Sequence, residues 1–203
     1  MQPTDILAQE HRIIEQVLCC LEKLVEQSLQ ARRLDGQAAR EAVDFFRFFA
    51  DRCHHGKEEE HLFPMLEAKG LPRHGGPTGV MLYEHEAGRA LVRGMDESIE
   101  AASRGNLDAL QQFVSHARDY IQLLRAHIHK EDHCLFAMAN QVLSDADQRS
   151  LMESFELVES ELAGEATHEK YIAIANDLAD RFGVPRAQIG TEEGATRWAC
   201  SHV

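Results

Sequence analysis

The chain has 203 residues, which is enough for one large domain or two small ones with a substantial core. Its 21 Lys and Arg residues face 34 acidic residues, a formal net charge of −13 that would repel phosphate backbones and argues against a nucleic-acid partner. No apolar run approaches the length that spans a bilayer, and no charged-then-apolar leader is present, so we expect a cytosolic protein with no membrane partner. The five cysteines form no C-x-x-C pair, which argues against a disulfide framework.

Four long helices are predicted over the first 140 residues, because apolar residues recur there at spacings of three and four. Their approximate ranges are 5–33, 37–69, 78–104 and 107–142. The Gly- and Pro-rich segment that follows residue 69 is the clearest break in the chain. Short connections between long helices favour antiparallel neighbours, so we predict an all-α fold, an up-down-up-down four-helix bundle.

The pattern changes beyond residue 143, and we predict a bundle domain over 1–143 followed by an extension over 144–203. Residues 144–147 resemble a capping box that opens a helix with Leu151 and Phe155 on its apolar side. Another helix is predicted over about 167–182. We expect both helices to pack against the outside of the bundle, and the tail from Gly183 to be mostly irregular.

Two segments of the chain share the pattern H-x-x-K-E-[E/D]-x-x-L-F-x-M. They begin at His54 and His127, 73 positions apart, and each places a glutamate four residues after the histidine, Glu58 and Glu131. On a helix, residues four apart lie about 40° apart around the axis and about 6 Å apart along it. Each histidine and its glutamate can therefore reach one point.

A weaker repeat lies upstream of each segment, where Glu10-His11 recurs as Glu84-His85. All six candidate ligands fall on apolar stripes that should be buried: His11, His54, Glu58, His85, His127 and Glu131. A single histidine on such a stripe is more often a hydrogen-bonded core residue. Burying this duplicated set without partners would cost several kcal/mol per group, so the set favours a metal site.

The six ligands favour two ions, because six would fill the shell of a single ion and leave the duplication unexplained. If both glutamates bridge two ions, a histidine pair caps each ion: His11 with His54, and His85 with His127. Each ion then keeps open positions for water, an oxo bridge or a small ligand. Imidazole together with carboxylate suits iron, and also manganese or zinc.

Residues 5–140 resemble the hemerythrin family, in its bacterial HHE cation-binding branch. The two repeated segments match that family's hallmark stretches, and His11 and His85 match its other two histidine positions. The resemblance implies a non-haem di-iron centre, oxo- or hydroxo-bridged, inside a four-helix bundle. Oxygen-carrying members have a fifth histidine at the position of Met81, one turn before His85, and they use a longer spacing, with Asp, where this chain has Glu131.

The absence of that fifth histidine should open a second coordination position and favour reaction at the metal over oxygen storage. We therefore expect a protein that binds or reduces a small oxidant (oxygen, nitric oxide or peroxide) in sensing or stress response. An iron-responsive regulatory or interaction module, or an iron-handling protein without turnover, is the alternative. A plain bundle that binds zinc adventitiously is the third possibility.

Several polar residues flank the six ligands and are expected on a solvated face or in hydrogen bonds behind the ligands: His55, Glu59, Glu60, His61, His129, Asp132 and His133. Glu59 is the best spare ligand among them. Ligating histidines usually donate their second N–H to an acceptor, although the pattern does not identify which acid serves each histidine. Cys53 and Cys134 are interpreted as buried, inert thiols, with a peroxide-responsive thiol beside the iron as the alternative.

Overall fold

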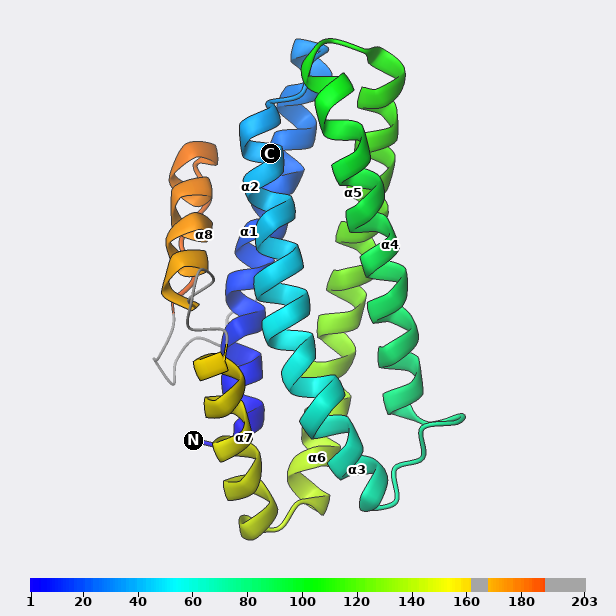
Figure 1. Cartoon of the computed structure of the whole chain (residues 1–203), viewed down its shortest axis with the longest axis vertical. Coiled ribbons are helices and arrows are strands. Elements are labelled where there is room, and N and C mark those ends of the chain that lie inside the picture. Colours follow the sequence, from blue (N-terminus) through cyan, green and yellow to red (C-terminus); the bar gives the residue numbers. More distant parts are fainter. Residues whose placement is uncertain (162–167, 189–203) are drawn as a thin grey trace.

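The computed structural model describes residues 1–161 and 168–188, and these ranges contain helices and no strand. Four long helical rods run up, down, up and down beside one another (Figure 1). The first rod is α1 (Pro3–Ala31), and the third is α4 (Pro77–Ser103). The second comprises α2 (Gly36–Phe45), η1 (Phe46–His55), η2 (Glu58–Leu62) and α3 (Phe63–Ala68). The fourth comprises α5 (Leu107–Lys130), η3 (Glu131–Leu135) and α6 (Phe136–Val142).

The ends of these rods follow from local chemistry, which is why the predicted boundaries are close to the observed ones. The side chain of Asn106 caps α5 by accepting a hydrogen bond from the Ala109 amide at 3.0 Å. Gly70 follows α3 with a φ of 97°, a left-handed conformation that favours glycine and ends helices. The all-α bundle is therefore confirmed.

Three stretches of the second and fourth rods are π-helical, which the sequence did not predict. Of these, η2 and η3 begin at Glu58 and Glu131, so the same bulge occurs in both copies of the repeated segment. A π turn holds one more residue than an α turn and so shifts the register of the residues after it. The expectation that Cys134 is buried is wrong: it is exposed, and Leu135 faces the core instead.

The two further helices lie along the α1 side of the bundle (Figure 1). They are α7 (Asp145–Glu161) and α8 (His168–Phe182), close to the predicted ranges. Ser144 and Asp147 form the expected capping box, with the Ser144 amide 2.9 Å from the Asp147 carboxylate. Gln16 of α1 donates to the Ala175 carbonyl of α8 at 2.7 Å. Beyond residue 188, the predicted irregular tail lies outside the described residues.

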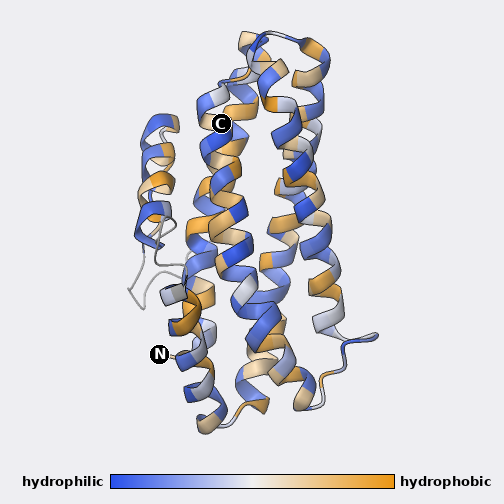
Figure 2. Ribbon diagram, in the orientation of Figure 1, coloured by the Kyte–Doolittle hydropathy of each residue, from blue (hydrophilic) through white to orange (hydrophobic). Residues whose placement is uncertain are grey.

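Apolar side chains of the bundle form two clusters, separated along every rod by a polar layer. On α1, Leu7 belongs to one cluster and Ile13 to the other, with His11 between them. On α4, Met81 and Val92 flank His85 in the same way. Hydrophobic and hydrophilic residues alternate along each rod (Figure 2). The polar layer is therefore enclosed by hydrophobic packing above and below.

Among the described residues, no helix is long and apolar enough to cross a membrane. Cys20, Cys53 and Cys134 carry free thiols. Cys19 is disulfide-bonded.

Candidate metal centre

The structure brings all six predicted ligands together in the polar layer. Two groups of four donors arise, and in each group the ligand atoms lie within 4.8 Å of one another. One group is His11, His54, Glu58 and Glu131, and the other is His55, Glu58, His85 and His127. Glu58 belongs to both groups, as a ligand that bridges two ions would. His55 is the one member that was predicted to flank the ligands and not to be one of them.

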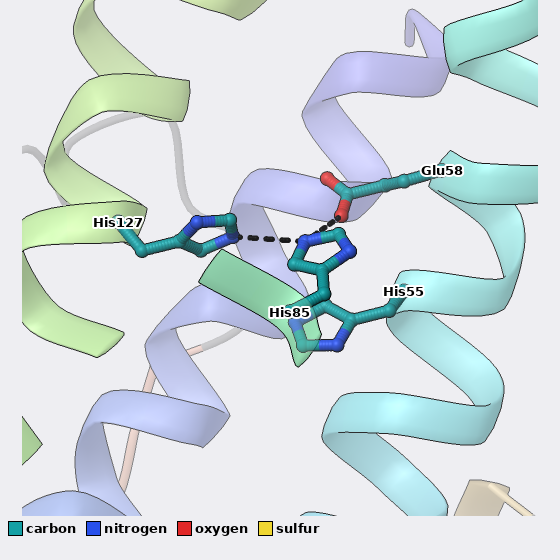
Figure 3. A group of neighbouring side chains, drawn as sticks. All are labelled: His55, Glu58, His85 and His127. Carbon is teal, nitrogen blue, oxygen red and sulfur yellow. Dashed lines mark hydrogen bonds and ion pairs between the residues drawn. The ribbon is translucent and has the colours of Figure 1, made fainter. Parts of the chain in front are cut away.

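The two glutamates lie between the histidine pairs. Oε1 of Glu58 is 3.7 Å from Nε2 of His54, and its Oε2 is 3.5 Å from Nε2 of His85. Oε2 of Glu131 is 3.3 Å from Nε2 of His11 and 3.1 Å from Nε2 of His127. Each carboxylate therefore contacts one histidine of the first pair and one histidine of the second pair. Figure 3 shows Glu58 and His127 reaching His85 from opposite sides.

The donor atoms of this layer fit a metal because they are buried without hydrogen-bond partners. Within the described part of the chain, this holds for both carboxylate oxygens of Glu58 and of Glu131 and for the Nε2 atoms of His11 and His54. A buried polar group left in this way costs about 1–3 kcal/mol, more when it is charged. Positive ions at these atoms would remove that penalty.

Each of the four predicted histidines donates a hydrogen bond from its other ring nitrogen, Nδ1, to the carboxylate of an acidic residue. The pairs are His11 with Asp132 at 2.7 Å, His54 with Glu10 at 2.8 Å, His85 with Glu59 at 2.6 Å, and His127 with Glu84 at 2.9 Å. Such a bond fixes the tautomer, so that Nε2 presents its lone pair to the centre. The expectation that Glu59 is a spare ligand is not supported, because its carboxylate accepts hydrogen bonds from His85 and Arg89.

The lysines of the two repeated segments hold two of these acids. Lys57 donates to Glu10 at 2.5 Å, and Lys130 donates to Glu84. The residues of the repeated pattern thus have distinct positions: a histidine and a glutamate face the centre, and the lysine fixes the acid behind that histidine. The acid after each glutamate reaches across to a histidine of the other half. The repeat therefore encodes a pseudo-symmetric centre with its supporting contacts.

Burial and neighbouring charges set the protonation of the metal-free centre. Burial, and then the charge of Glu131, raise the pKa of Glu58 well above its usual value. Burial also acts to raise the pKa of Glu131, but His127 and His11 outweigh it and hold that pKa well below its usual value. Burial lowers the pKa of His11, yet its bonds to Asp132 and Glu131 raise it to about 9. His11 is thus protonated near neutral pH in the metal-free centre, and metal binding must release that proton.

His55 is buried, so its expected place on a solvated face is wrong. Its side chain is only 5% exposed, and its ring stacks on His85 with centroids 3.7 Å apart. Burial lowers its pKa to about 4, which makes it a neutral imidazole. The doubled histidine, His54-His55, was the sequence signal that could have indicated this residue. By contrast, His129 and His133 are exposed as expected.

A cavity of about 160 Å³ adjoins one side of the centre. His55, His85 and His127 line it, together with Tyr120 and Arg89. Gly88 also lines it, and a Cβ there would lie 3.5 Å from the Tyr120 ring. The cavity therefore offers small molecules a place beside the donor atoms.

A third cluster of possible ligands, Glu10, Glu159 and His168, lies at the edge of the bundle. Lys57 is hydrogen-bonded to both of its acids, at 2.5 Å to Glu10 and 2.7 Å to Glu159. The ammonium group supplies the positive charge that these acids need, so this cluster requires no metal.

The model of the hemerythrin HHE cation-binding domain matches residues 2–139, the stretch that contains all six predicted ligands. The chain belongs to this family. As a hemerythrin HHE protein, it is expected to bind metal cations, and the buried His and Glu groups agree with that role.

Relatives among curated proteins carry no functional description. The chain is 24% identical over 182 residues to the uncharacterized proteins Rv1995 of Mycobacterium tuberculosis and Mb2018 of Mycobacterium bovis. In both cases the match covers 90% of this chain and 70% of the relative. No solved structure matches the chain.

Proposed function

We propose that this hemerythrin HHE protein holds two non-haem iron ions and binds or reduces a small oxidant, such as oxygen, nitric oxide or peroxide, in sensing or stress response. The observation that carries the proposal is that two buried donor groups share Glu58. The ligands would be His11, His54, Glu58, His85, His127 and Glu131. A cytosolic location stays a prediction from the composition.

The mixed donor set supports iron, because imidazole and carboxylate together suit iron, with manganese and zinc as less favoured occupants. Bound iron would supply the electrons for reduction of the oxidant. The two glutamates would hold the pair together, and the Nδ1 bonds of the histidines would keep their rings aimed at it. The enclosing apolar clusters would limit access to small molecules.

Metal analysis and optical spectra on anaerobically prepared protein test the proposal. We expect two irons per chain and an oxo-to-iron charge-transfer band in the near ultraviolet after oxygen or peroxide is added to the reduced protein. Addition of nitric oxide should instead give the visible absorption of an iron–nitrosyl adduct. The variant Glu58→Gln should lose the iron pair, whereas Glu60→Gln, at an exposed neighbouring position, should keep it. If the protein contains only zinc after expression in iron-rich medium, the proposal is contradicted.

One observation favours the alternative of an iron-responsive regulatory module. Lys57, whose neighbour Glu58 lies in the centre, donates to Glu159 of α7, and His168 of α8 lies 3.8 Å from Glu10. α8 thus contacts the acid that orients His54, and α7 is linked to that acid through Lys57. If this alternative holds, metal removal should raise hydrogen exchange in α7 and α8, while no oxidant is consumed. Steady consumption of peroxide or nitric oxide with a reductant would decide for the first proposal.

A further inference from the structure

The two halves of the centre are related residue by residue, except at the position after the first motif histidine. The 73-residue offset pairs His54 with His127 and Glu58 with Glu131, but it pairs His55 with Ile128. The repeat that relates α1 to α4 pairs Leu7 with Met81. Neither half therefore supplies an imidazole at the position where oxygen-carrying relatives have their fifth histidine. His55 is therefore the only imidazole in the two donor groups without a counterpart.

His55 has the same two-sided arrangement as His11 and His54, each with an acid at Nδ1 and a buried Nε2 that has no hydrogen-bond partner in the described ranges. Its Nδ1 lies 3.2 Å from Oδ1 of Asp51, one turn earlier, and Arg89 donates to that same oxygen at 2.8 Å. Its Nε2 is buried and has no hydrogen-bond partner among the residues that the structure describes. An acid on one ring nitrogen and an unpartnered second nitrogen are typical of a histidine that ligates metal.

His55 belongs to the donor group of His85 and His127. The ligand atoms of that group, with Glu58, all lie within 4.8 Å of one another, and Figure 3 shows His55 entering it from the second rod beside His85. We infer that His55 is a seventh ligand, the third imidazole of the ion that His85 and His127 hold. This inference rests on the proposed function.

The two ions are then inequivalent. One has three imidazoles, from His55, His85 and His127, and the other has two, from His11 and His54. His55 replaces the histidine that oxygen-carrying relatives have at the position of Met81, although it comes from another helix. An external ligand would then bind the ion held by His11 and His54, whereas the cavity that His55 lines would adjoin the ion with three imidazoles.

The test compares iron binding by the wild-type chain with that of His55→Gln, which keeps a side chain able to bond Asp51. We expect the wild-type chain to bind two irons with two distinct Mössbauer doublets. His55→Gln should bind one of them at least about tenfold more weakly, the lower bound of the loss seen when only a residue behind a ligand is removed. The matched control is His133→Gln, an exposed histidine near the same centre, which should bind both irons as the wild type does.

Adding Met81→His to His55→Gln separates loss of a ligand from general damage, because Met81 is buried one turn before His85. The double variant should recover both irons and two doublets. Circular dichroism of the metal-free proteins should be alike throughout. Full iron binding by His55→Gln with wild-type doublets, or a loss that Met81→His does not restore, would overturn the inference. A wild-type chain that binds no iron pair would overturn both the inference and the proposed function.

Discussion

Nζ of Lys57 lies 2.5 Å from a carboxylate oxygen of Glu10, and both side chains are buried. A buried ion pair stabilises a fold weakly, but removal of one partner leaves the other charge buried and uncompensated. Here the remaining charge would also be the acid that orients His54. Loss of either partner should therefore both destabilise the bundle and disturb the orientation of His54.

Lys57→Met should lower the free energy of unfolding of the metal-free protein by about 3–5 kcal/mol, because Glu10 then stays buried without its cation. The matched control is Lys130→Met, which removes the equivalent lysine from the second copy. Lys130 is 38% exposed, so we expect a loss of only about 0–1 kcal/mol. Urea unfolding followed by circular dichroism measures both values, and equal losses would contradict the distinction drawn from burial.

Glu10 should make the stability of the protein sensitive to acid. Burial raises the pKa of Glu10, but the hydrogen bond from His54 and the charge of Lys57 outweigh it and bring the pKa to about 2, below the unfolded value of 4.5. The folded state therefore binds this proton less readily than the unfolded state does. The resulting stabilisation is present above pH 4.5 and is lost as the pH falls from 4.5 to about 2.

In Glu10→Gln, the unfolding free energy of the metal-free protein should accordingly fall less steeply with acid over that range. Glu60→Gln serves as the control, since Glu60 is exposed and should leave the wild-type slope unchanged. Urea unfolding at a series of pH values gives the slopes. Identical slopes for Glu10→Gln and the wild type would show that this carboxylate is not ionised in the folded state.

Glu84→Gln should weaken iron binding by about 10–100-fold without removing a ligand. The acid accepts hydrogen bonds from His127 and Lys130, and a neutral amide in its place would hold the imidazole less firmly. Glu97→Gln on an exposed face of the same helix is the control. Competition with a chelator of known affinity measures the change, and an affinity within a factor of about two of the wild type would contradict the role given to Glu84.

The free thiols should differ sharply in reactivity. Burial raises the pKa of Cys20 to about 12, and burial followed by the charge of Glu10 does the same for Cys53, so both stay protonated at neutral pH. Cys134 is exposed. Maleimide labelling at neutral pH, followed by peptide mass spectrometry, should modify Cys134 first and reach Cys20 and Cys53 only after unfolding. Early labelling of Cys53 would show that its part of the bundle opens readily.

The helices and the six predicted ligands were accessible from sequence because both depend on local spacing. Helix ends follow from capping residues and from glycines such as Gly70, and buried faces follow from residues three and four apart. The duplication of a histidine with a glutamate four residues later then identified the polar layer. The predictions for His55 and Cys134 were wrong because both assumed regular α-helical register through segments that include π turns.

The sequence by itself determined an all-α bundle and six candidate metal ligands that meet in one buried layer, since periodicity and repetition are properties of the chain. Only the tertiary structure decided which acid holds which histidine, because Asp132 and His11 are 121 residues apart and meet only when the rods pack. The same packing placed the imidazole of His55 beside His85 and brought α7 to Lys57. Contacts between distant residues depend on how whole helices fit together, which no local pattern specifies.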